Sequence, residues 1–240
     1  MRPPLRISVL TPTLNEERHI GGAVASAIEA AADEVIVADG GSIDGTVRVA
    51  RQAGAKVVSG ERGRGSQLRL ASQHATGEVL LVLHADNRLP PTAREQIERA
   101  LSNRRVVCGA FRQRIDAEGW LYRWLERGNA LRAHRLRLPY GDQGVFVRRE
   151  TLEAIGGVPS LPLMEDVAMM QRLNRLINRR GDRSPVLLDG PLAVSARRWR
   201  QAGVVRQTLR NWSLLAAFVC GVSAERLAAR YAPHAEGDAT

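Results

Sequence analysis

The sequence has little cysteine, one lysine, few aromatic residues and no long apolar run. Cys108 and Cys220 lie far apart and have neither a C-x-x-C nor a histidine-partnered spacing, which argues against a disulfide framework or a zinc site and predicts a reducing, cytoplasmic environment. The longest apolar stretch, Leu214–Val219 with its neighbours up to Val222, is far shorter than the ~20 residues of a transmembrane helix. The first residues lack the apolar segment of a secretory signal, so we expect the mature chain to begin at Met1.

The net charge of +10 does not by itself indicate a nucleic-acid-binding protein. Lys56 is the only lysine among 35 basic residues, so the charge reflects a bias towards arginine over the whole chain. Aromatic residues make up 4% of the sequence and do not alternate with basic ones, as base-stacking surfaces require. We therefore expect no nucleic-acid partner. A chain of 240 residues with 44% hydrophobic residues fits one folded domain with a substantial core.

Over the first ~100 residues, apolar runs typical of strands alternate with helical patterns. The predicted strands are Ile7–Thr11, Val35–Ala38, Lys56–Ser59 and Val79–Leu83. This alternation is typical of a Rossmann-like parallel sheet with helices on both faces. The fold class is therefore α/β.

The second half of the chain has a mixed pattern. We predict strands at 106–115, 144–147, 185–188 and 192–195, and helices at 120–135, 166–177 and 201–219. The sequence predicts one domain over residues 1–232, with a parallel-sheet half at about 5–103, a mixed α/β half at about 104–232, and a frayed tail at 233–240.

Polar, glycine-rich segments follow the four predicted strands of the first half. They span residues 11–16, 39–46, 60–65 and 84–87. Because ligands bind at the carboxyl ends of strands in open α/β sheets, we expect these segments to form one site.

The segment after the second strand is Asp39-Gly-Gly-Ser-Ile-Asp44. Asp39 or Asp44 could accept hydrogen bonds from a base or a ribose hydroxyl, and Gly41 would let the backbone approach the ligand closely. A turn in which Ser42 or Asp44 caps the next helix explains the same residues equally well.

Two further segments suit a diphosphate. Arg62-Gly-Arg-Gly65 offers backbone amides and two guanidiniums before a helix start, although a solvated loop is the alternative and the Lys-Ser/Thr of a P-loop is missing. Asp86 follows a buried apolar run, and a divalent cation bridging it to a diphosphate would balance its charge. The alternative is that Asp86 or Asn87 caps the following helix.

Three segments of the second half also carry candidate residues. Glu165 and Asp166 open a predicted helix, where the macrodipole favours acids, and either carboxylate could take a proton from an attacking nucleophile. The turn 141–144, Gly-Asp-Gln-Gly, is equally a structural turn or a substrate loop. The run 197–200, Arg-Arg-Trp-Arg, either neutralises a diphosphate or begins a solvated helix.

Taken in order, these segments resemble the family 2 glycosyltransferases of GT-A fold from about Arg6 to Arg200. The resemblance lies in Pro12-x-x-Asn15-Glu16, Asp39-Gly-Gly-Ser-x-Asp44-Gly-Thr46, the apolar strand before Asp86, and Glu165-Asp166. The segments 84–86, 141–144, 163–166 and 195–199 are similar to a small bacterial branch of that family associated with radical-SAM and selenium-related genes.

The resemblance implies transfer of a sugar, with inversion, from a nucleoside-diphosphate donor that is commonly UDP-linked. It implies that Asp39 lies near the uracil or ribose, that Asp86 is the ligand of Mg²⁺ or Mn²⁺, and that Asp166 is the general base, with Glu165 beside it. The donor-binding residues would be Pro12, Asn15, Glu16, Asp39, Gly41, Ser42, Asp44, Arg62, Gly65, Gln67, Asp86 and Arg198. His84 stands where many members have aspartate, so either the metal rests on Asp86 alone or catalysis is metal-independent, with Arg62, Arg64 or Arg197 stabilising the leaving diphosphate. Ser195 replaces the glutamine of the processive Gln-x-x-Arg-Trp element.

Two other functions fit parts of the pattern. A nucleotidylyltransferase would share the α/β half but should carry Gly-x-Gly-x-Arg after the first strand, which is absent. A non-catalytic sugar-nucleotide sensor would explain the incomplete Asp-x-Asp at 84–86. The 206–222 region, with Trp212, Leu214, Leu215, Phe218 and Val219 beside Arg206 and Arg210, either rests on an anionic membrane and reaches a lipid acceptor, or forms core or a homodimer contact.

Overall fold

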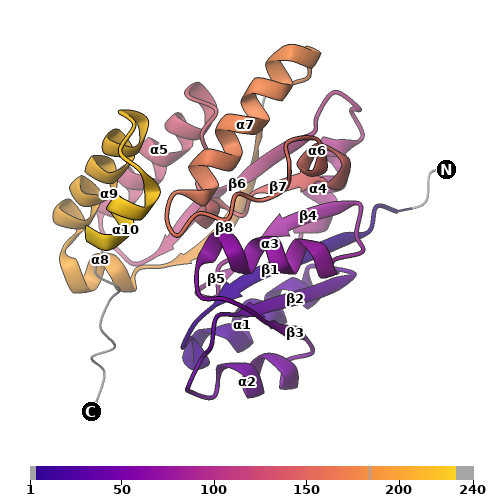
Figure 1. Cartoon of the computed structure of the whole chain (residues 1–240), viewed down its shortest axis with the longest axis horizontal. Helices are drawn as coiled ribbons and strands as arrows, with labels where there is room; N and C mark the ends of the chain where they lie inside the picture. Colours follow the sequence, from indigo (N-terminus) through magenta and orange to yellow (C-terminus); the bar gives the residue numbers. More distant parts are fainter. Residues whose placement is uncertain (1–3, 184, 231–240) are drawn as a thin grey trace.

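The computed structural model describes residues 4–183 and 185–230, so the predicted tail at 233–240 lies outside the described residues. One sheet of eight strands, in the order β3-β2-β1-β4-β7-β6-β8-β5, runs through the molecule (Figure 1). The strands are β1 Ile7–Thr13, β2 Glu34–Asp39, β3 Lys56–Ser59, β4 Val79–Val82, β5 Asn87–Arg88, β6 Cys108–Asp116, β7 Phe146–Arg148 and β8 Val186–Ser195.

Helices connect and cover these strands (Figure 1). They are α1 Glu17–Glu29, α2 Thr46–Gln52, α3 Arg64–His74, α4 Ala93–Leu101, α5 Trp120–Arg135, α6 Arg149–Ala154, α7 Glu165–Arg180, α8 Arg197–Ala202, α9 Val204–Val219 and α10 Ala224–Arg230, together with a short 3₁₀ turn, η1, at Gly141–Gln143. The parallel pairing of β3, β2, β1 and β4 confirms the Rossmann-like half. Beyond β4 the sheet becomes mixed, because β7 pairs antiparallel with both β4 and β6.

The alternation of side chains along the central strands explains why both faces of the sheet are covered. Val9 of β1 and Leu81 of β4 belong to one core cluster, which also contains apolar residues of α1 and α4. Their neighbours Leu10 and Leu80 point into a second cluster, with residues of α3 and α7. A strand that is buried on both faces appears in the sequence as a continuous apolar run, which is why these strands could be predicted from the sequence.

The structure differs from the sequence prediction at β8, at α8 and α9, and at three elements that were not predicted. Both predicted strands at 185–188 and 192–195 belong to β8, because both pair with β6 across an irregularity in register. The predicted helix at 201–219 is divided into α8 and α9 at Gly203, whose φ of +80° breaks the helix. The short elements β5 and α6, and the helix α10, were not predicted.

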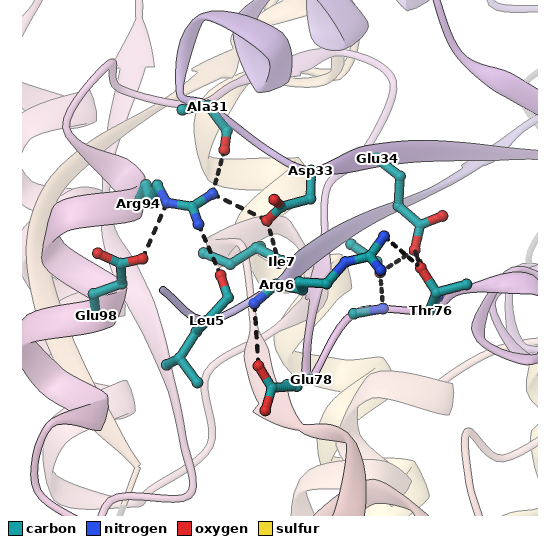
Figure 2. A network of polar contacts seen from close by, with 12 residues as sticks. Leu5, Arg6, Ile7, Ala31, Asp33, Glu34, Thr76, Glu78, Arg94 and Glu98 are labelled. Carbon is teal, nitrogen blue, oxygen red and sulfur yellow. Dashed lines mark hydrogen bonds and ion pairs between the residues drawn. The ribbon is translucent and has the colours of Figure 1, made fainter. Parts of the chain in front are cut away.

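A network of polar contacts connects the amino ends of β1 and β2 (Figure 2). The candidate residues follow the opposite, carboxyl ends of the strands. Arg94 of α4 donates to the Leu5 and Ala31 carbonyls at 2.8 and 2.6 Å and pairs with Asp33 at 3.0 Å. Asp33 in turn accepts the Ile7 N–H at 2.8 Å. These contacts fix the start of β1 against α1 and α4 and therefore serve the fold.

Across the described parts of the chain, none of the helices has the length and apolar character needed to cross a membrane.

Candidate active site

A cavity of about 130 Å³ opens beyond β4, where both halves of the chain contribute side chains. Its polar walls come from the segment after β4, the η1 turn and the starts of α3, α7 and α8; its apolar wall includes α9. The lining residues are Arg64, His84, Asp86, Asn87, Tyr140, Asp142, Leu163, Met164, Asp166, Val167, Val194, Ser195, Arg198, Trp199, Asn211, Leu214 and Leu215.

The Asp39 segment lies at the carboxyl end of β2, outside the lining of this cavity. Asp39 is 3% exposed, and its Oδ2 accepts the N–H groups of Gly41 and Ser42 at 3.0 Å each. The Ser42 hydroxyl donates to Oδ1 at 2.5 Å. Gly41 has φ +92° and open space around the position of a Cβ, so the backbone beside Asp39 is accessible to a ligand.

The first strand-end segment, which follows Pro12 of β1, is tied to the second. The Asn15 N–H donates to Ser42 Oγ at 2.8 Å, and the Glu16 N–H donates to Thr46 Oγ1 at 2.7 Å. Asp44 accepts the Thr46 N–H at 2.9 Å in the turn before α2, whose cap is Gly45 and not Ser42 or Asp44. These contacts hold the ends of β1 and β2 as one surface.

Gln67 and Gly65 of α3 join this surface to the rest of the site. Gln67 is 4% exposed and donates to the Thr13 and Ala38 carbonyls at 2.6 and 2.8 Å, so it bridges β1 and β2. A Cβ on Gly65 would lie 2.4 Å from the Pro159 carbonyl oxygen, so the close packing of the backbone leaves no room for a larger residue here. Arg62 is exposed, with its backbone beside the Gly40 position.

Asp86 lies among positive groups. Burial acts to raise its pKa, but the guanidiniums of Arg198 and Arg197 hold the pKa below its usual range, so the carboxylate is ionised at neutral pH. Arg197 Nε lies 3.5 Å from Asp86 Oδ2, and its Nη2 also pairs with Glu16 Oε1. Neither Asp86 nor Asn87 caps α4, which begins after Thr92.

His84 lines the cavity two residues before Asp86. Burial, and then the charge of Arg64, lower its pKa to about 4. The imidazole is therefore neutral at physiological pH and adds no charge of its own.

The two acids at the start of α7 have different surroundings. Asp166 lines the cavity, and its Oδ2 accepts the Gly141 N–H at 2.9 Å. Glu165 is 1% exposed and lies outside the cavity wall, where its Oε1 pairs with Arg64 Nε at 3.0 Å. Burial raises the pKa of Glu165 to about 7 despite Arg64. Asp166 is thus placed to meet a ligand, and Glu165 holds Arg64.

The residues around Asp86 are compatible with one divalent cation. No group of three or more His, Cys, Asp and Glu side chains is arranged to hold a metal within the described residues. Mg²⁺, however, commonly takes one or two carboxylates and completes its shell with substrate phosphates and water. The ionised carboxylate of Asp86 meets that minimum.

The structure therefore brings Asp86, Asp166 and Arg198 together and leaves Asp39, Asp44 and Arg62 on the neighbouring strand ends. It also adds cavity residues that were not predicted as site residues, notably Asn87, Tyr140 and Asp142, with Asn211, Leu214 and Leu215 of α9. The glycine-bounded turn at 141–144 was the sequence signal for Asp142. No sequence signal pointed to Tyr140, and the sequence indicated Leu214 and Leu215 only as part of a membrane-facing, core or dimer region.

Solved structures with this architecture belong to the GT-A class. S. aureus TarS 1-349 in complex with UDP-GlcNAc has a TM-score of 0.63 and 17% identity, over 80% of this chain and 58% of that one. Glucosyl-3-phosphoglycerate synthase from Mycobacterium tuberculosis, in complex with Mn²⁺, UDP-glucose and phosphoglyceric acid, has a TM-score of 0.54 and 23% identity, over 79% of this chain and 72% of that one. The chain has the GT-A fold.

Sequence comparison defines the family. Residues 8–157, more than half of the chain, match the model of glycosyl transferase family 2, and the chain belongs to this family. Glycosyltransferase AglJ of Haloferax volcanii is 38% identical over 89 residues, which cover 36% of this chain and 29% of AglJ.

Proposed function

We propose that this protein transfers a sugar from a nucleoside-diphosphate donor, UDP-linked, to an acceptor with inversion at the anomeric carbon. The observation that carries the proposal is the meeting of Asp86, Asp166, Arg64 and Arg198 in one cavity beside the strand ends. A base, an anchoring carboxylate and positive charges are what such a transfer requires. The similarity to the branch associated with radical-SAM and selenium-related genes stays a prediction.

In the proposed mechanism, the surface around Asp39 holds the nucleoside, and the arginines hold the diphosphate. Asp166 takes the proton of the acceptor nucleophile, which forms a bond to the anomeric carbon from the side opposite the diphosphate. The bond between that carbon and the phosphate oxygen breaks, and its electron pair leaves with the nucleoside diphosphate. The Gly141 N–H orients Asp166 for this step, since it donates to Oδ2.

Asp86 would hold Mg²⁺ or Mn²⁺, which supplies positive charge for the phosphate oxygens of the leaving group. Arg64, Arg197 and Arg198 act on the same diphosphate from the protein side. Positive groups placed in advance where charge develops stabilise a transition state without reorganisation at the moment of reaction.

The test is release of UDP from a panel of UDP-sugars by purified wild type and Asp166→Asn, with Mn²⁺ present. We expect turnover to fall by about 10²-fold or more, as on loss of a general base. Asp189→Asn, at a fully exposed aspartate, is the matched control. Undiminished turnover in Asp166→Asn would show that Asp166 is not the base. Donor binding without any UDP release in wild type would instead favour the sensor function.

We also propose that α9 brings the protein to an anionic membrane surface, where a lipid-linked acceptor would be found. Val205, Leu209, Trp212 and Val219 are 53–61% exposed at helical spacing. Leu214 and Leu215, on another side of α9, line the cavity. The membrane-facing surface and the acceptor side of the cavity would then belong to one helix.

Vesicle binding tests this part of the proposal. Trp212→Ala should weaken sedimentation with vesicles of anionic lipid, whereas Ile43→Ala, at a 90% exposed apolar residue far from α9 in sequence, should not. Light scattering provides the second measurement. Unchanged vesicle binding, with Trp212→Ala converting a dimer to a monomer, would show that this face is a homodimer contact instead.

A further inference from the structure

Three residues that line the cavity have a buried side-chain oxygen with no hydrogen-bond partner among the described residues. One is the Tyr140 hydroxyl, and the other two are acceptor oxygens, Asn87 Oδ1 and Asp142 Oδ1. Burying an acceptor without a donor costs about 1–3 kcal/mol, so native proteins rarely leave such atoms unpaired. Two of them in one cavity indicate a ligand that supplies donors.

The hydrogen bonds that hold Asn87 and Asp142 in place involve the Asn87 amide nitrogen and the Asp142 backbone carbonyl, so the two side-chain oxygens take no part in them. The Asp142 backbone carbonyl accepts the Asn87 and Gln113 side-chain amides, each at 3.1 Å. Asn87 therefore uses its nitrogen to hold the η1 turn, and its Oδ1 remains. Asn87 belongs to β5, which pairs with β8, and Gln113 belongs to β6. The two free oxygens are thus held by the sheet before any ligand arrives.

The charge of the cavity narrows the ligand chemistry. Three carboxylates, Asp86, Asp142 and Asp166, and two guanidiniums, Arg64 and Arg198, line the cavity, so their charges nearly balance and do not call for a charged ligand group. Neutral hydroxyl groups donate without carrying a charge. Tyr140 adds an aromatic ring to the cavity wall. The guanidinium carbon of Arg132 lies 3.3 Å from the centroid of this ring, and the contact holds the ring in place.

We infer that Asn87 and Asp142 form a subsite that accepts hydrogen bonds from neighbouring hydroxyl groups of a sugar ring. The inference rests on the proposed function and deepens it, because it names the residues that distinguish one sugar from another. The ring belongs either to the donor or to a hydroxylated acceptor, and both have the same chemistry. Asp142 adjoins Asp166 through the η1 turn, since Gly141 bonds that carboxylate, so the subsite lies next to the proposed base.

Calorimetric binding of UDP and of a set of UDP-hexoses to wild type and Asp142→Asn tests the subsite. A donor-sugar subsite predicts that the variant loses about tenfold or more in affinity for the preferred UDP-hexose and none for UDP, because the amide nitrogen of asparagine, which donates, replaces one of the two accepting oxygens. Unchanged UDP affinity also shows that the variant is folded. Asp189→Asn should leave both affinities unchanged.

A second arm addresses the acceptor. If the subsite takes the acceptor, saturation-transfer NMR with UDP bound should show that one methyl glycoside contacts wild type. The signal of this glycoside should be absent with Asp142→Asn. Asp142→Ala repeats both arms with the whole carboxyl removed. Equal binding of UDP-hexoses and of methyl glycosides by all variants would overturn the inference. Failure of wild type to bind UDP or any UDP-hexose would contradict the proposed function itself, so the two failures are distinguishable.

Discussion

Replacing Glu165 by glutamine removes a negative charge that the fold buries almost completely. The carboxylate is 1% exposed and pairs with Arg64, whose side chain is 33% exposed. Burial raises the pKa of Glu165 to about 7, and Arg64 offsets that rise in part. Glutamine keeps the shape of the side chain and cannot ionise, so the variant isolates the effect of the proton.

The raised pKa gives a stability change of definite sign. In the unfolded chain the pKa is 4.5, so between pH 4.5 and 7 the folded state binds a proton that the unfolded state does not. The stabilisation is therefore complete below pH 4.5 and is lost as pH rises through 7. At 1.36 kcal/mol per pKa unit, the free energy of unfolding should lose about 3 kcal/mol from this group.

Urea denaturation of wild type and Glu165→Gln from pH 5 to 8 measures this change. His84 acts with the opposite sign, because its pKa is lowered to about 4 and its stabilisation grows as pH rises towards 6.5. His84 is present in both proteins, so the difference between their unfolding free energies should report Glu165. We expect wild type to lose about 3 kcal/mol relative to the variant over this range. A difference that does not change with pH would refute the raised pKa.

Two substitutions on α3 test the contacts that hold the strand ends. Gly65→Ala should destabilise by about 1–3 kcal/mol, because the new Cβ meets backbone atoms that cannot move aside, whereas Gly128→Ala, with open space in α5, should stabilise by up to about 1 kcal/mol. Gln67→Ala should cost about 2–3 kcal/mol by leaving two buried carbonyls without this donor, and Gln73→Ala, exposed on the same helix, less than about 0.5 kcal/mol. Chemical denaturation measures the stability of all four variants. Equal stability of the two glycine variants would contradict the close packing at Gly65, and equal stability of the two glutamine variants would contradict the bridge that Gln67 makes between β1 and β2.

The parallel half of the fold could be predicted from the sequence because its signals are local. A strand such as β4 is a continuous apolar run, since helices cover both its faces, and a run of this kind is visible without knowing its neighbours. The later elements depend on contacts between distant segments. The two residues of β5 are a strand because they pair with β8, and the division between α8 and α9 depends on the positive φ of Gly203.

In the candidate site, too, some residues could be predicted from local motifs, whereas the roles of others depend on contacts between distant segments. Motif order selected Asp86 and Asp166, and both line the cavity. The roles of Glu165 and Asp142 depended on burial and neighbours that spacing does not reveal. Adjacent acids at a helix start look alike in sequence, yet Glu165 is enclosed with Arg64 while Asp166 faces the cavity. The η1 turn fits a structural or a substrate-binding role, and the unpaired oxygen of Asp142 favours the second.

Arg197 links the two halves of the chain at the point where the diphosphate is proposed to lie. It starts α8, and it pairs both with Glu16, at the beginning of α1, and with Asp86 beyond β4. A cation bound at Asp86 would take a carboxylate that Arg197 now shares, and a diphosphate would offer Arg197 new oxygens. Donor binding and the contact between the halves would then be coupled through one guanidinium. If Glu16 keeps Arg197 in place while Asp86 exchanges its partner, the positive charge would stay beside the leaving group during the proposed transfer.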